Sequence, residues 1–90
     1  MASSYEVRKV AQKIKTVYRE IDTRREKVRK DVREVPHWWK GKASEAFVGG
    51  YEQINNQIGA LLSSMDELER QLKAIAAAID DWARLQAEQK

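Results

Sequence analysis

The chain of 90 residues contains no cysteine, one proline, four glycines and one histidine, His37. The absence of cysteine excludes a disulfide framework, a cysteine nucleophile and thiolate metal sites. One histidine without cysteine cannot supply the ligands of a zinc site, so we expect no metal and no cofactor. No run of eighteen apolar residues is present, so the sequence predicts no membrane-spanning helix.

The rest of the composition is typical of a folded, helix-rich protein. The chain is 42% hydrophobic and 34% charged, and its abundant Ala, Lys, Arg, Glu, Gln and Leu favour helices. Residues 1–42 carry 13 Lys and Arg against 6 Asp and Glu, whereas residues 43–90 carry 4 against 8. The length predicts one small domain, in which a basic arm pairs with an acidic arm.

The first arm predicts an amphipathic helix over about residues 4–35. Ser3 and Glu6 have the spacing of a capping box, in which each side chain bonds the other residue's backbone N–H. Pro36 is expected to end the helix, because the residue before a proline is disfavoured in helical conformation. The apolar side chains recur every seven residues, at Val7, Ile14, Ile21, Val28 and Val35.

The second arm predicts a helix over about residues 43–86. Its apolar side chains alternate spacings of four and three, which is typical of a coiled coil or a long bundle helix. Three glycines inside the pattern cost about 1 kcal/mol each relative to alanine, and we expect the helix to continue through them. The pattern comprises Phe47, Tyr51, Ile54, Ile58, Leu61, Met65, Leu68, Leu72, Ile75, Ile79 and Trp82.

Two long helices with a break at residues 36–42 predict an all-α, antiparallel two-helix hairpin. Pairing the arms around this break places Ser4 opposite about Ile75, so that residues after about Ile79 overhang. A hairpin is one layer thick and leaves apolar surface uncovered, which predicts dimerisation into a four-helix bundle. The expected core and dimer seam comprises Val7, Ile14, Ile21, Val28, Phe47, Ile54, Ile58, Leu61, Met65, Leu68, Leu72 and Ile75.

The break has the sequence HWWKGKASEAF, residues 37–47. A tight turn between two helices exposes the end of their core, and a large indole ring can cover it while its N–H finds a carbonyl. Trp38 and Trp39 are both candidates, and the sequence does not decide which is buried. Gly41 supplies the backbone freedom to redirect the chain.

These residues resemble the WXG family, the small early-secreted-antigen-like proteins of type VII (ESX/Ess) secretion systems. Trp39, Lys40 and Gly41 form the Trp-X-Gly triplet, and Ala46 and Phe47 follow it as in the family. The resemblance covers the whole chain, including its length and its two amphipathic arms. It implies a helical hairpin that dimerises with itself or with a sister protein. It also implies export in the folded state without a cleaved signal peptide.

The resemblance further implies that Trp39 and Gly41 belong to a turn and export motif, together with the neighbouring Trp38. In the family this turn and a C-terminal signal form the surface that the secretion ATPase reads. Many members carry a tyrosine, three residues and an acid after the second helix, and this chain does not. The candidate signal is a looser combination of apolar and acidic residues, Asp80, Asp81, Trp82 and Leu85, unless a partner supplies it.

The sequence bears on three functions other than export. A catalytic carboxylate pair needs a cleft that desolvates one carboxylate, and a hairpin offers none, so no enzyme and no small-molecule substrate are predicted. The chain could instead be a coiled-coil scaffold, or a basic helical module that binds nucleic acid or an anionic membrane surface. Acidic residues lie among the basic ones, which disfavours the module that binds nucleic acid or a membrane. The basic residues are Arg24, Arg25, Lys27, Arg29, Lys30 and Arg33.

The sequence therefore predicts a non-enzymatic type VII secretion substrate or secreted adaptor. Its expected partners are a second copy or a sister WXG protein, and a type VII secretion ATPase. Its expected location is outside the cell or on the cell surface.

Overall fold

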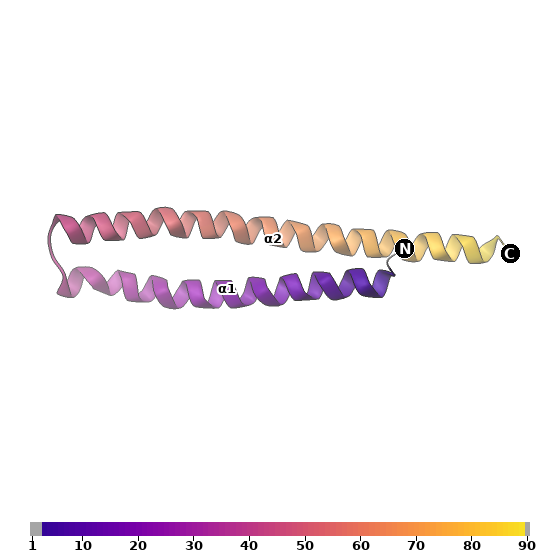
Figure 1. Ribbon diagram of the computed structural model, residues 1–90, viewed down its shortest axis with the longest axis horizontal. Coiled ribbons are helices and arrows are strands. Elements are labelled where there is room, and N and C mark those ends of the chain that lie inside the picture. Colours follow the sequence, from indigo (N-terminus) through magenta and orange to yellow (C-terminus); the bar gives the residue numbers. More distant parts are fainter. Residues whose placement is uncertain (1–2, 90) are drawn as a thin grey trace. The chain divides into compact units, whose positions relative to one another are not determined.

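The computed structural model describes residues 3–89 and contains two helices within that range, α1 (Ser4–Trp38) and α2 (Lys42–Glu88) (Figure 1). The chain divides into two compact units. We term them the turn unit, Arg19–Ser63, and the terminal unit, which combines Met1–Tyr18 with Ser64–Lys90. In each unit a segment of α1 lies beside an antiparallel segment of α2 (Figure 1).

Helix α1 begins as the sequence predicts and ends later. The N–H of Glu6 donates to Oγ of Ser3 at 3.2 Å, so Ser3 caps the helix. The helix continues through Pro36 to Trp38. Proline removes one backbone donor, but the N–H of Trp39 still donates to the carbonyl of Val35 at 2.9 Å. The last turn therefore closes around Pro36.

Helix α2 is uninterrupted from Lys42 to Glu88 and includes Gly49, Gly50 and Gly59. The carbonyl of Gly41 accepts from the N–H of Glu45 at 3.1 Å, the first hydrogen bond of this helix. The cost of three helical glycines is thus smaller than the stabilisation from the apolar pattern, as expected.

Each unit has a narrow core of its own. In the turn unit, Val32, Val35 and Leu62 are buried together with Ser44. Among the described residues of the terminal unit, the buried apolar ones are two alanines, Ala11 at 1% exposure and Ala76 at 0%. Side chains this small fill little volume, so the two helices bury few large groups between them.

Helix α2 turns a different column of residues towards the core than the sequence predicts. Leu62, Glu69 and Ala76, seven residues apart, are buried. This column includes polar residues, so apolar periodicity marks the neighbouring column instead. The predicted residues that are half-buried are Val7, Ile14, Ile21, Ile58, Met65 and Leu72. The predicted residues that lie outside the core of a hairpin, and remain candidates for a dimer seam, are Val28, Phe47, Ile54, Leu61, Leu68 and Ile75.

The pairing of the helices in the terminal unit is also shifted by about one turn from the predicted one. Nη2 of Arg8 lies 2.8 Å from Oδ2 of Asp80, and Nζ of Lys15 lies 3.9 Å from Oε1 of Glu69. Ser4 therefore lies near Asp80 rather than Ile75. Both ion pairs fit this alignment, and the small side chains of Ala11 and Ala76 are the apolar residues buried in it.

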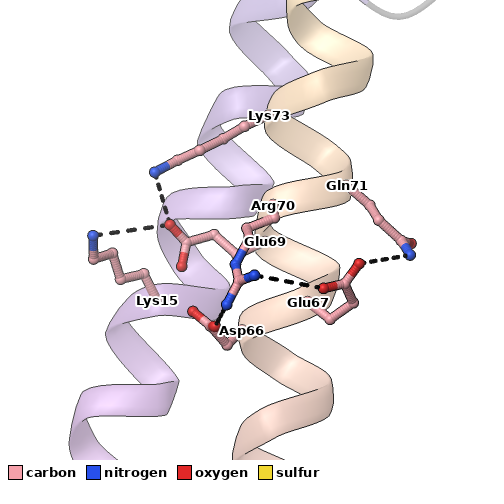
Figure 2. A network of polar contacts seen from close by, with 7 residues as sticks. All are labelled: Lys15, Asp66, Glu67, Glu69, Arg70, Gln71 and Lys73. Carbon is pink, nitrogen blue, oxygen red and sulfur yellow. Dashed lines mark hydrogen bonds and ion pairs between the residues drawn. The ribbon is translucent and has the colours of Figure 1, made fainter.

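Glu69 is the one buried carboxylate among residues 3–89, and it lies in a polar network (Figure 2). Its Oε1 lies 2.8 Å from Nζ of Lys73 and 3.9 Å from Nζ of Lys15. The hydrogen bond from Lys73 lowers the pKa of Glu69, assisted by the charges of both lysines and opposed by burial. A carboxylate in the core thus remains ionised because two cations face it.

We expect the free energy of unfolding to decrease as the pH falls below about 4.5, the ordinary pKa of Glu69. A carboxylate whose pKa is lower in the folded state than in the unfolded state stabilises the fold at any pH above its unfolded-state pKa. This stabilisation disappears as the pH falls through the folded-state pKa. In Glu69→Gln, the free energy of unfolding should therefore decrease less between neutral and acidic pH than in the wild-type chain. Urea unfolding over that pH range measures the decrease, which is the acid limb of the stability curve. Glu67→Gln is the control, because its contacts with Arg70 and Gln71 are exposed. An unchanged limb in Glu69→Gln would contradict this assignment.

Candidate functional site

The turn holds three aromatic side chains in one stack. The rings of Trp39 and Phe47 are 5.8 Å apart between centroids and tilted by 45°. The rings of Trp38 and Trp39 are 6.2 Å apart and stacked at 20°. Trp39 is half-buried, whereas Trp38 is 71% exposed. We infer that Trp39 covers the end of the core, because it is the less exposed indole and packs against Phe47, whereas Trp38 presents an indole to solvent.

Gly41 makes the change of direction between the helices. Its φ angle is +111°, and among residues 3–89 no non-glycine residue has a positive φ. Side chains with a Cβ rarely adopt this conformation. The glycine of the Trp-X-Gly triplet is thus required by the backbone itself.

Gly41→Ala is expected to reduce the free energy of unfolding by about 1–2 kcal/mol, because a Cβ strains a positive φ. Gly49→Ala is the matched control, since no atom lies within 4 Å of its Cβ position and its backbone is helical. That control should stabilise the fold by about 0.5–1 kcal/mol. Urea unfolding measures the change in the free energy of unfolding for both variants. The same change in Gly41→Ala and Gly49→Ala would contradict the assigned role of Gly41.

An open groove of about 370 Å³ adjoins the turn. Its lining includes the apolar residues Pro36, Trp39 and Val48 and the charged residues Lys40, Glu45 and Glu52. The groove offers an apolar surface with charges of both signs beside the triplet.

A second surface lies on α2, on the side that does not face the core. One column of it repeats every seven residues and is 46–55% exposed, and it comprises Phe47, Ile54 and Leu61 in the turn unit and Leu68, Ile75 and Trp82 in the terminal unit. The flanking column comprises Gly50, Gln57, Ser64, Gln71 and Ala78. We call the two columns the outer stripe. None of its eleven residues is charged, in a chain that is 34% charged.

The flanking column was not predicted from the sequence, because its residues do not form an apolar pattern. They share only the absence of charge at seven-residue spacing. In the turn unit the stripe borders an apolar groove of about 390 Å³. That groove is lined by Ile21, Arg24, Arg25, Val28, Tyr51, Ile54 and Ile58. Half-exposed apolar residues in a regular row, beside a groove, form a surface suited to another helix.

The candidate C-terminal signal residues have different surroundings. The Ser4 hydroxyl and then the Arg8 guanidinium lower the pKa of Asp80, so this residue joins the two segments of the terminal unit. Oδ1 of Asp81 lies 3.5 Å from Nη2 of Arg84. Trp82 and Leu85 are both about half exposed.

Part of the basic cluster of α1 is held by contacts within the turn unit. Nε of Arg25 donates to Oδ1 of Asn55 at 2.7 Å, and its guanidinium lies 3.2 Å from where a Cβ on Gly59 would stand. Nη1 of Arg29 lies 3.5 Å from Oε1 of Glu26. These contacts were not predicted from the sequence. The pair with Glu26 offsets the charge of Arg29, and the bond to Asn55 holds the Arg25 guanidinium against α2, which disfavours a surface for nucleic acid or an anionic membrane.

Residues 3–89 contain no group of three or more acidic or histidine side chains that could hold a metal ion. Neither helix, within the same residues, has a stretch apolar enough to cross a bilayer.

Comparison with known proteins agrees with this fold and turn. A solved structure described as Geobacillus thermodenitrificans EsxA, crystal form I, matches with a TM-score of 0.86 and 20% sequence identity, over 98% of this chain and 97% of that one. The fold is therefore an all-α two-helix hairpin, as predicted. Comparison with curated protein sequences finds no significant match.

The family model described as "WXG100: Proteins of 100 residues with WXG" matches residues 1–83. The chain belongs to the WXG100 family. This confirms the resemblance drawn from Trp39, Gly41 and the two amphipathic arms. WXG100 proteins are non-enzymatic proteins of type VII secretion, so the prediction that the chain is no enzyme is also confirmed.

Proposed function

We propose that the chain is a type VII secretion substrate or secreted adaptor that is exported folded, as a pair of hairpins. The observation that carries this proposal is the arrangement of the turn. Trp39 is packed against Phe47, while its stacked neighbour Trp38 is 71% exposed. Stability alone requires only the first ring, and an exposed indole is a natural anchor for a partner. We assign this surface to recognition by a type VII secretion ATPase.

Pairing of hairpins follows from the outer stripe. Six large side chains at heptad spacing stay about half exposed in a single hairpin. A partner that covers them would remove this apolar surface from water, which stabilises the pair by roughly 25 cal/mol per Å² of area buried. The narrow core of each unit leaves this surface uncovered. The partner is a second copy or a sister WXG protein, and the paired hairpins form a four-helix bundle.

The C-terminal part of α2 is proposed to complete the export surface. Trp82 and Leu85 are exposed and apolar, and Asp81 is exposed beside them. Asp80 is the exception among the four candidates, because it pairs with Arg8 and contributes to folding. After export, the chain is expected outside the cell or on its surface.

Export is tested in a Gram-positive or mycobacterial host with an active type VII system. Trp38→Ala and Leu85→Ser alter exposed side chains, so both variants should remain folded by circular dichroism. We expect each to reduce the secreted fraction about tenfold, which is a loss of about 1.4 kcal/mol in recognition. His37→Ala, also in the last turn of α1, and Gln86→Ser are the matched controls. A folded variant secreted at the wild-type level would contradict the role of its residue.

A coiled-coil scaffold is the competing function, and the same assay separates it. A scaffold would remain in the cell in every variant, and the wild-type chain would not bind a secretion ATPase domain in solution. Wild-type retention in the cell, with the fold intact, would therefore overturn the proposed export.

A further inference from the structure

The groove beside the turn adjoins a second groove further along the helices. The second has a volume of about 330 Å³, against about 370 Å³ for the first. Both are lined by Pro36, Val48 and Glu52, and both lie within the turn unit. We term the two together the turn groove. On α2 its lining extends from Ser44 to Asn56, a length of about 18 Å along the helix axis.

The turn groove lies on the flank of α2 opposite the outer stripe. Glu45 and Glu52 line the groove, whereas Phe47 and Ile54, each two residues later, belong to the outer stripe. Successive residues of an α-helix are about 100° apart around its axis, so each of these groove residues is about 200° from its neighbour on the stripe. A second hairpin that covers the outer stripe therefore leaves the turn groove open.

The two sides of the turn groove carry opposite charges. Arg29 and Arg33 line it from α1, and Lys40 lines it at the turn. Glu45 and Glu52 line it from α2. Among the residues that the structure describes, Arg33, Glu45 and Glu52 form no ion pair. These free charges favour a ligand with acidic groups along one edge and basic groups along the other.

The remaining lining of the turn groove favours a helix over an extended peptide. Val32, Trp39 and Val48 give the groove apolar surface. Except near the turn, the backbone N–H and C=O groups of both sides are bonded within α1 and α2. An extended peptide would lose water from its own backbone groups and find few partners to replace it. A helix satisfies its backbone internally, so apolar contact and charge are enough to hold it.

We infer that the turn groove binds an amphipathic helix of another protein, over about three helical turns. The apolar stripe of this helix packs on Trp39 and Val48, its acidic edge faces Arg33, and its basic edge faces α2. The inference goes beyond the proposed function, because this surface is separate from the exposed indole of Trp38 and from the outer stripe. A pair of hairpins joined through the outer stripe presents two turn grooves, one on each copy.

The test is the binding of labelled synthetic helices to the full chain, followed by fluorescence anisotropy. The first probe has a leucine stripe, glutamates along one edge of the stripe and lysines along the other. The second probe has the same composition, with both charges mixed on each edge. We expect the first probe to bind at least about fivefold more tightly, because it alone presents an opposite charge to each side of the groove.

Gly49→Phe and Gly50→Phe are matched variants that identify the surface. Both positions are exposed, and a Cβ at either meets no atom within 4 Å. Gly49 lines the turn groove, whereas Gly50 belongs to the outer stripe. Gly49→Phe places a ring in the groove and should weaken binding of the first probe at least about tenfold, while Gly50→Phe should change it less than about twofold.

Arg33→Glu tests the charge of the α1 side. This variant makes both sides acidic, so a third probe with lysines on both edges should gain at least about fivefold over the first probe. Lys27→Glu is the control, because it makes the same change of charge about 120° around α1 from Arg33, outside the turn groove. The ratio of the two affinities should stay unchanged in that control.

The inference is overturned if the full chain binds none of the probes, or if Gly49→Phe and Gly50→Phe have equal effects. Equally tight binding of the first and second probes would mean that the groove does not select by charge. Equally tight binding of a probe made non-helical by prolines would mean that the occupant is an extended chain. Loss of pairing in Gly49→Phe, on a sizing column with light scattering, would mean that a second copy fills the groove.

Discussion

Trp39→Ala is expected to lower the free energy of unfolding by about 2–3 kcal/mol, somewhat less than the ~3–5 kcal/mol for a fully buried tryptophan. The ring of Trp39 lies between Trp38 and Phe47, and its removal uncovers the end of the turn unit's core. For a domain of this size the melting temperature should fall by about 10–20 °C. Thermal unfolding followed by circular dichroism gives both quantities.

Trp38→Ala is the matched control for this prediction. The two residues are adjacent and identical, and Trp38 is 71% exposed, so its removal should cost below about 1 kcal/mol. The same two variants then separate stability from recognition, since Trp38→Ala is expected to lose export while it keeps its fold. Equal destabilisation by both substitutions would contradict the assignment of Trp39 as the ring that covers the core.

Leu62→Ala is expected to have the second large effect, about 2–4 kcal/mol, as for other leucines removed from a core. Leu62 is 4% exposed and is the one large apolar side chain of α2, within residues 42–88, that is buried. Because it belongs to the core of a single hairpin, its cost should not depend on protein concentration. Urea unfolding at two concentrations about fiftyfold apart measures this.

Leu61→Ala is the comparison, since Leu61 is the adjacent leucine on the outer stripe and is 51% exposed. Its removal should weaken pairing of hairpins, so the loss of stability should shrink as dilution separates the pair. A cost of Leu61→Ala that is independent of concentration would contradict its place in a dimer seam. A cost of Leu62→Ala that varies with concentration would contradict the core position of Leu62.

The elements of the fold could be predicted from the sequence because they depend on local properties. Seven-residue spacing from Val7 to Val35 and from Phe47 to Trp82 specifies two long helices, whatever each helix packs against. Few glycines and one proline leave a single place for a turn. The family could be recognised for the same reason, since Trp39 and Gly41 stand between those helices.

The column of α2 that faces α1 could not be predicted from periodicity. Asn55 and Glu69 lie in that column, so apolar spacing points to the neighbouring one, with Leu61 and Leu68. A polar residue is accepted in a core only where a partner satisfies it. Arg25 bonds Asn55, and Lys73 with Lys15 faces Glu69, contacts that join residues far apart in the chain.

The sequence by itself determined what nearest neighbours decide, namely two helices, one turn, and the need for glycine where the chain reverses. Only the tertiary structure decided that Trp39 is half-buried against Phe47 while Trp38 stays exposed. It also decided that α2 turns Leu62 and Ala76 inward and leaves Leu61 and Ile75 outside. The physical reason is that burial depends on the alignment of two segments. That alignment brings together polar partners such as Arg25 with Asn55 and Lys15 with Glu69, which no periodic pattern in either helix records.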